Sequence, residues 1–170
     1  MRRLVAMGED EWVLDLGGTR DSSLIGGRGE MIAWKYLRGR GIWSHRIGRW
    51  YPFPADYPFK RSELSYQLEG VSGDQVDYLK NMCLRGPRRY DFVGTRRRHD
   101  PHGLAGEVEE VYLVEVKTTG PGPGRHDLDS HMKGRVPEDI ETAKALGFTV
   151  LLIVVRLFDN WGCKVTYREL

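Results

Sequence analysis

The chain is short of long hydrophobic runs, of cysteine and of lysine, and each shortage narrows the class of protein. The longest apolar stretch, Phe148 to Val155, is followed by Arg156 and is far shorter than the roughly 18 residues of a membrane-spanning helix. The first residues, MRRLVAMGEDEW, lack the apolar stretch of a secretory signal. Cys83 and Cys163 share no motif. Because unpatterned cysteines without a signal fit a reducing compartment, we expect a cytoplasmic protein with no membrane segment.

What is present suits a globular domain. At 170 residues, 40% of them hydrophobic and 29% charged, the chain is long enough for one domain with a sizeable core. The formal net charge of +2 is too small to indicate a nucleic-acid partner. The kind of positive charge says more, because 19 of the 26 basic residues are arginines, which suit two-pronged contacts with phosphate. A GC-rich genome produces the same bias, so arginine content alone does not identify the partner.

Hydrophobic periodicity and turn residues predict both helices and strands. Helices are expected from near Gly29 to Gly39, over 73–86 with Asp74 as N-cap, and over 136–147. Strands are expected over 11–18, 88–95, 108–119, 148–158 and, as an edge strand, 162–170. The aromatic and proline-rich segment 42–61 has no period and favours loops or short strands. This order predicts an α/β fold, a mixed sheet flanked by helices, as a single domain over 1–170 with an insertion at about 42–86.

One predicted strand, YLVEVKTT at 112–119, carries two charges among strand-forming residues. Side chains alternate along a strand, so Glu115 and Lys117 share one face while Val114 and Val116 share the other. Burying an ionised group is costly unless it is paired or binds a metal. The stretch is therefore either half of a solvated sheet face or part of an active site.

Two further acidic residues are associated with this strand in the expected fold. Asp91 begins the strand that pairs with it, through a turn-rich connection typical of a β-hairpin. Glu30 lies in the first helix, where Ala33 and Leu37 follow at i+3 and i+7, so it shares the apolar stripe that faces the sheet. Glu30, Asp91, Glu115 and Lys117 are therefore the candidate catalytic residues.

An acidic residue, a Glu-x-Lys on the next strand, a helix and an apolar strand, in this order, resemble the PD-(D/E)xK nuclease superfamily, which includes type II restriction enzymes and archaeal Holliday-junction resolvases. The likeness covers residues 24–40 and 88–158. GRGEMIAWKYL is similar to the first helix of the resolvases, YDFVGT to the Asp strand and VEVKTT to the Glu-x-Lys strand, with Tyr90 where the motif has proline. The resemblance implies a restriction-endonuclease-like fold, whose core is helix, three strands, helix and strand.

By this resemblance, Asp91, Glu115 and the backbone carbonyl of Val116 bind Mg²⁺ or Mn²⁺. Lys117 orients or deprotonates the attacking water or holds the scissile phosphate, and Glu30 reaches the metal directly or through water. These residue types suit the chemistry, because Mg²⁺ takes oxygen ligands, needs few carboxylates and relieves charge in phosphodiester hydrolysis. The expected activity is that of a Mg²⁺-dependent deoxyribonuclease, an endonuclease in DNA repair, recombination or restriction.

Arginines bracket the strand that Asp91 begins. Five of them are expected to face solvent and to contact the DNA backbone: Arg88, Arg89, Arg96, Arg97 and Arg98. The segment 42–61 interleaves aromatic residues with arginine. Such a stretch more often packs at a core edge or a homodimer interface than on unpaired bases, although stacking on bases is also compatible with it.

Each candidate also has a structural interpretation. Glu115 and Lys117 can form an exposed ion pair on a solvated strand face, Asp91 can cap a turn after Pro87, and Glu30 can favour a helix N-terminus through the dipole. Two rival functions follow. One is a non-catalytic nucleic-acid-binding protein that retains the nuclease fold, and the other is an interaction domain whose carboxylates form surface salt bridges.

Overall fold

The computed structural model describes residues 5–6, 11–13, 22–47, 68–85, 90–98, 106–120, 139–158 and 162–170. The elements, in chain order, are β1 (Val5–Ala6), β2 (Glu11–Val13), α1 (Ser22–Gly39), β3 (Trp43–Arg46), α3 (Gly73–Arg85), β4 (Phe92–Arg97), β5 (Val108–Thr119), α5 (Ile140–Ala145), β6 (Phe148–Leu157) and β7 (Gly162–Glu169).

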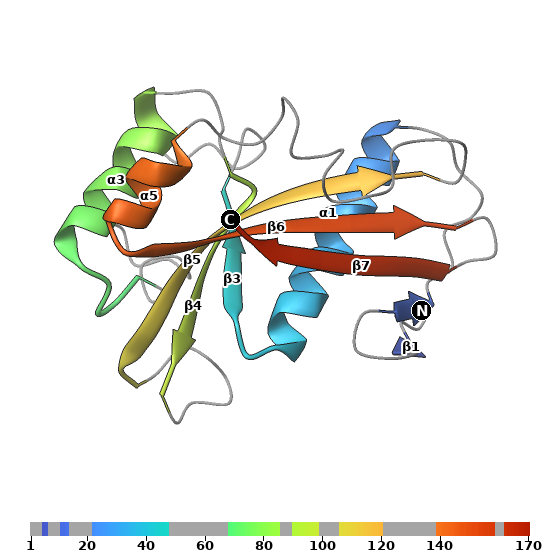
Figure 1. Ribbon diagram of the computed structural model, residues 1–170, viewed down its shortest axis with the longest axis horizontal. Coiled ribbons are helices and arrows are strands. Elements are labelled where there is room, and N and C mark those ends of the chain that lie inside the picture. Colours follow the sequence, from blue (N-terminus) through green and yellow to red (C-terminus); the bar gives the residue numbers. More distant parts are fainter. Residues whose placement is uncertain are drawn as a thin grey trace. The chain divides into compact units, whose positions relative to one another are not determined.

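The strands of these ranges form one sheet in the order β1-β2-β7-β6-β5-β4-β3. β4 pairs with both β3 and β5 in antiparallel fashion, and β2 pairs antiparallel with β7. Figure 1 shows β5 and β6 running in the same direction and β7 running in the opposite one. The sheet is therefore mixed, and the expected α/β class is confirmed. The prediction that β7 is an edge strand was wrong, because β2 covers its outer side, with Trp12 opposite Cys163.

The described elements belong to two compact units. The first contains β1, β2, α1 up to Tyr36, the ends of β5 and β6 from Val116 and Leu152, and β7. The second contains the end of α1, β3, α3, β4, the beginning of β5 up to Glu115, α5 and the beginning of β6.

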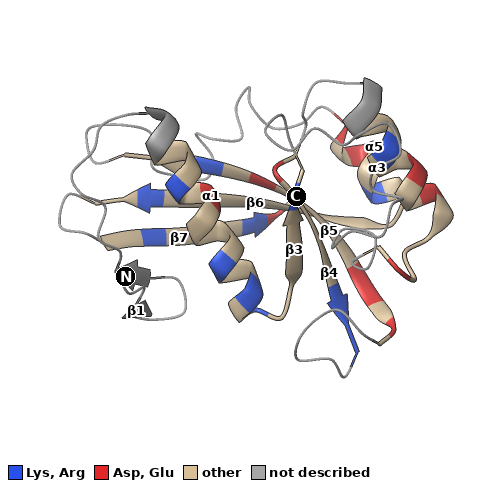
Figure 2. Cartoon of the chain, turned by 180° about the vertical axis from the view of Figure 1, so that it is seen from behind, with Lys and Arg blue, Asp and Glu red and all other residues tan. Residues whose placement is uncertain are grey.

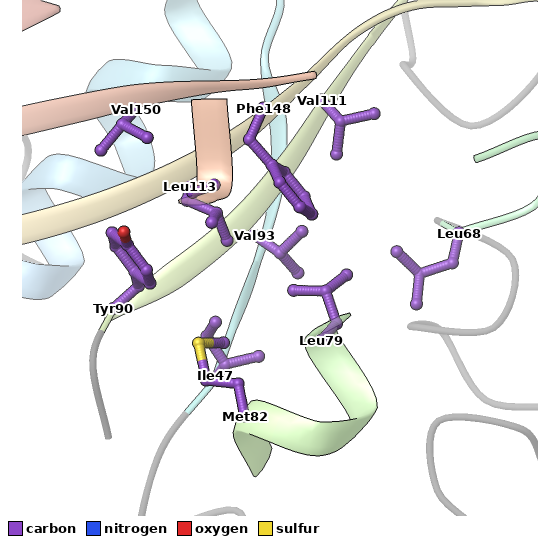
Figure 3. Packing of buried hydrophobic residues seen from close by; sticks show 11 residues of the cluster. Ile47, Leu68, Leu79, Met82, Tyr90, Val93, Val111, Leu113, Phe148 and Val150 are labelled. Atoms are coloured by element: carbon purple, nitrogen blue, oxygen red, sulfur yellow. The ribbon is translucent and has the colours of Figure 1, made fainter. Parts of the chain in front are cut away.

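The core of the second unit lies between the sheet and the helices α3 and α5 (Figure 3). Val93 of β4 and Leu113 of β5 are paired across the sheet and fully buried. Leu79 and Met82, one turn apart on α3, pack in the same cluster. Ile47, which follows β3, also belongs to it, so the segment interpreted as an insertion contributes both β3 to the sheet and side chains to the core.

Ser72, and not Asp74 as the sequence predicted, caps the start of α3. The Ser72 hydroxyl accepts a hydrogen bond from the Gln75 backbone N–H at 3.3 Å and donates to the Gln75 side chain at 3.2 Å. Ser72 is therefore the N-cap, and its hydroxyl satisfies one of the backbone N–H groups that a helix start leaves open. Asp74, the predicted N-cap, lies inside the first turn instead, where its charge suits the helix dipole.

The first unit is built on α1, β6 and β7. Ile32, Ala33 and Tyr36 of α1 are buried. The apolar run of β6 is buried at consecutive positions from Leu151 to Val155, which confirms the prediction of a strand covered on both faces. The rings of Tyr36 and Tyr167 lie 6.0 Å apart between centroids.

Candidate functional site

Asp91 is held by the backbones of two neighbouring strands in the second unit. It lies directly before β4, where Phe92 pairs with Val114 of β5. The Asp91 N–H donates to the Val114 carbonyl at 2.8 Å, and the Asp91 carbonyl accepts from the Ile47 N–H at 2.8 Å. Glu115 follows Val114 on β5. The fold thus brings the chain at Asp91 next to the chain at Glu115, as the hairpin prediction required.

Both of these carboxylic residues are buried. Asp91 is 3% exposed and Glu115 is 8% exposed. Exposed ion pairing on a solvated strand face, the structural interpretation of Glu115, therefore does not describe it. Alternation along β5 puts Glu115 on the same side of the sheet as Leu113, which belongs to the core cluster. A buried carboxylate is stable only when hydrogen bonds, an opposite charge or a metal ion compensates it.

The donor set of this pair fits Mg²⁺ or Mn²⁺. Carboxylate oxygens are the hard ligands that Mg²⁺ prefers, and it needs only one or two of them because it keeps several waters. Within the described residues no group of three or more histidine, cysteine, aspartate or glutamate side chains could hold a metal. A zinc-type site built from such a group is therefore not found in those ranges.

Lys117 and Val116 follow Glu115 on the same strand. Val116 is buried, whereas Lys117 is partly exposed. By strand alternation Lys117 shares the side of Glu115, and Val116 lies on the opposite side. A charged amine two residues from a buried carboxylate is the local arrangement that the sequence predicted.

In the first unit, Glu30 lies where α1 contacts β5. An added Cβ at Gly29 would lie 2.7 Å from Cβ and 2.6 Å from Cγ2 of Thr118, so only glycine permits this approach. Glu30, the next residue, is partly buried, and Ala33 and Leu37 of the same stripe are buried, as predicted. Thr118 and Lys117 alternate across β5. The contact therefore brings α1 to the strand of Lys117, but on the side of Thr118.

Gly29→Ala is expected to destabilise the protein by about 1–3 kcal/mol, because an overpacked contact must be relieved by moving the backbone or the stiff Thr118 side chain. Gly27→Ala is the matched control, since nothing lies within 4 Å of an added Cβ there. It should instead stabilise α1 by up to about 1 kcal/mol through helix propensity. Urea unfolding measures both. Adding Thr118→Gly should make Gly29→Ala harmless, and equal effects of the two alanines would contradict the close approach.

The described arginines at the end of β4 are mostly paired with glutamates. Arg96 forms an ion pair with Glu110 at 2.6 Å. Arg98 forms one with Glu109 at 3.1 Å, and a longer one with Glu107. Figure 2 shows this basic end of β4 beside the acidic beginning of β5. Arg98 is exposed as predicted and Arg96 only partly, and glutamates offset the positive charge expected of this rim.

The prediction that Arg97 faces solvent was wrong. Its side chain is 7% exposed, and its guanidinium donates to the backbone carbonyls of Gly106 at 3.0 Å and Glu69 at 2.6 Å. These bonds join the hairpin to the segment before α3. These two carbonyl oxygens help to compensate the burial of so large a cation. Arg88 and Arg89 lie outside the described residues.

A polar cluster that the sequence did not reveal lies beside Asp91 in the second unit. The hydroxyls of Tyr78 and Tyr90 both donate to the carboxylate of Asp139. Burial raises the pKa of Tyr90 well above its usual range, and the nearby Asp139 and Tyr78 raise it further. Tyr90 therefore remains a protonated donor at neutral pH. The one signal in the sequence was Tyr90 itself, in place of the motif's proline.

No protein-family model matches this chain, and no curated protein or solved structure is significantly similar to it. None of the helices in the described ranges has the length and apolar character needed to span a bilayer.

Proposed function

We propose that this protein is a Mg²⁺-dependent endonuclease that hydrolyses DNA phosphodiester bonds in repair, recombination or restriction. The observation that carries this function is the pair of buried carboxylic residues, Asp91 and Glu115, on two adjoining strands. Lys117 follows Glu115 at the spacing of the Glu-x-Lys motif. Two carboxylic residues brought together on adjoining strands supply the oxygen ligands that Mg²⁺ needs.

The order of elements supports a restriction-endonuclease-like fold. Helix α1, strands β3, β4 and β5, helix α5 and strand β6 follow one another as helix, three strands, helix and strand, with α3 added between β3 and β4. This is the core that the resemblance implies. β3 supplies the first of its three strands.

In this function Asp91 and Glu115 hold the metal, together with the Val116 carbonyl. A bound Mg²⁺ supplies charge stabilisation for the phosphate and a more acidic water. Lys117 orients the attacking water, takes its proton or holds the scissile phosphate. The resemblance also gives Glu30 a role at the metal, directly or through water. However, α1 contacts β5 on the side of Thr118, opposite to Glu115, so Asp91 and Glu115 carry this proposal.

DNA contacts are assigned to the arginines that flank Asp91, but the five arginines are not equally suited to them. Arg88, Arg89, Arg96 and Arg98 remain candidates. The ion pair of Arg98 is exposed and that of Arg96 is partly exposed; such pairs are weak, so phosphate can replace glutamate there. Arg97 is unsuited to a direct phosphate contact in this conformation, because backbone carbonyls occupy its guanidinium.

The deciding experiment incubates the purified chain with supercoiled plasmid, linear duplex, single strands and a four-way junction. We expect nicking or cleavage in Mg²⁺ and Mn²⁺ and none in EDTA. Cleavage that persists in EDTA would exclude this mechanism. Salt-dependent DNA binding without cleavage in any metal would identify a non-catalytic nucleic-acid-binding protein instead.

A further inference from the structure

Asp139 stands at the N-cap of α5 but does not cap it. Aspartate at an N-cap ordinarily accepts a hydrogen bond from a backbone N–H of the first turn. The Asp139 side chain makes no such bond. Its two oxygens instead accept hydrogen bonds from the hydroxyls of Tyr78 and Tyr90, the latter at 3.4 Å. The carboxylate therefore serves the tyrosines rather than its own helix.

The two tyrosines tie three segments of the second unit together through Asp139. Tyr78 comes from α3, and its ring lies 5.5 Å from that of Phe148 between centroids. Tyr90 immediately precedes Asp91 in the chain, and it is fully buried (Figure 3). A buried tyrosine hydroxyl needs a partner, because an unsatisfied donor in the core is costly. The position of Tyr90 is thus coupled to that of Asp139.

The coupling of Tyr90 to Asp139 affects Asp91, the next residue in the chain. The backbone of Asp91 is bonded to Val114 on one side and Ile47 on the other. Those bonds fix its place between the strands, and the Tyr90 side chain fixes the chain on its N-terminal side from within the core. We propose that Asp139 is a positioning residue, which through Tyr90 holds the start of β4 so that the Asp91 carboxylate is set for metal binding. This role rests on the proposed function.

Tyr90→Phe and Asp139→Ala test it. Tyr90→Phe keeps the buried ring and deletes only the hydroxyl. Asp139→Ala removes no helix cap and deletes the acceptor of both tyrosine hydroxyls. Groups that orient metal ligands typically contribute about 10–100-fold to metal affinity or activity. We therefore expect the Kd for Mn²⁺, measured by calorimetry, to rise by about 10–100-fold. The backbone amides of Asp91 and Ile47 should exchange hydrogen faster, because their mutual hydrogen-bond network loosens.

Tyr112→Phe is the matched control. Tyr112 is also a buried tyrosine of the second unit that donates to a carboxylate, that of Glu110, but it is not adjacent to Asp91. It should change neither the Mn²⁺ affinity nor the exchange at Asp91. If Tyr90→Phe and Asp139→Ala leave exchange at Asp91 and Ile47 unchanged, or raise it no more than at every other amide, Asp139 is not a positioning residue. A wild type that binds no Mn²⁺ contradicts the proposed function, whereas the exchange result still decides whether Asp139 positions Asp91.

Discussion

Glu115→Gln and Asp91→Asn are each expected to abolish Mg²⁺-dependent DNA cleavage, with a loss of at least about a thousandfold in rate. Both replacements keep the shape of the side chain and remove its charge. A bound metal supplies several kcal/mol of charge stabilisation in the transition state, and each 1.36 kcal/mol or so corresponds to tenfold in rate. Time courses on plasmid DNA over a range of Mg²⁺ concentrations measure the loss.

Thermal unfolding separates a metal ligand from a structural carboxylate. A metal at about 100 times its Kd stabilises the folded state by about 2.7 kcal/mol. Wild type should therefore melt at a higher temperature in Mn²⁺ than in EDTA, and both variants should lose that gain. Glu109→Gln is the control, because Glu109 lies on the same strand but is exposed. If the Glu115 variant keeps the gain and full activity, Glu115 is not a ligand.

Local patterns predicted β5 and α3 closely. The observed β5 has the expected bounds, because β-branched and aromatic residues recur along its whole length from Val108 to Thr119. α3 spans Gly73–Arg85 against an expected 73–86. The hairpin that places Asp91 beside Glu115 followed from the same local signals. The backbone of the candidate site was thus predictable where the local sequence pattern identifies a strand.

Elements that depend on distant partners were predicted only in part. α1 begins at Ser22, seven residues before the expected start. The glycines in its first turns have low helix propensity, which argued against a helix there, but the structure includes them in the helix. Gly29 is one of them, and its contact with Thr118 explains its presence. The segment 42–61 was expected to form loops or short strands, and β3, Trp43–Arg46, is such a strand, but its pairing with β4 was not predicted.

The same limit applied to polar side chains. Three consecutive arginines without apolar spacing predict an exposed run, but Arg97 is drawn inward by carbonyls at Gly106 and Glu69 that are far apart in sequence. Asp139 lay in the expected helix 136–147, whose observed part, α5, begins at Ile140. No local sequence pattern indicated that the hydroxyls of two tyrosines distant in sequence would donate hydrogen bonds to its carboxylate. Long-range hydrogen bonds of this kind carry no local signature.

Lys117→Met is expected to lower the cleavage rate by about 10²–10⁴-fold, the contribution typical of a positioned proton-transfer group. The Kd for Mn²⁺ should stay within a few-fold of the wild-type value, a difference on the order of RT in free energy. Methionine keeps the unbranched stem of lysine and removes its charge. Lys117 shares the side of Glu115 on β5, and in the proposed mechanism it does not bind the metal, so its loss should affect turnover and not metal affinity. Single-turnover rates and calorimetry measure the two quantities.

Lys117→Arg distinguishes the roles open to this amine. Arginine keeps the positive charge but cannot give up its proton in a protein. If Lys117 holds the scissile phosphate, the arginine variant should retain much of the activity that methionine loses, since guanidinium binds phosphate well. If Lys117 takes the proton of the attacking water, both variants should be equally slow. Lys164→Met, at an exposed lysine of β7, should change nothing. Loss of Mn²⁺ binding in Lys117→Met with turnover retained would show that Lys117 serves the metal site and not the reacting phosphate.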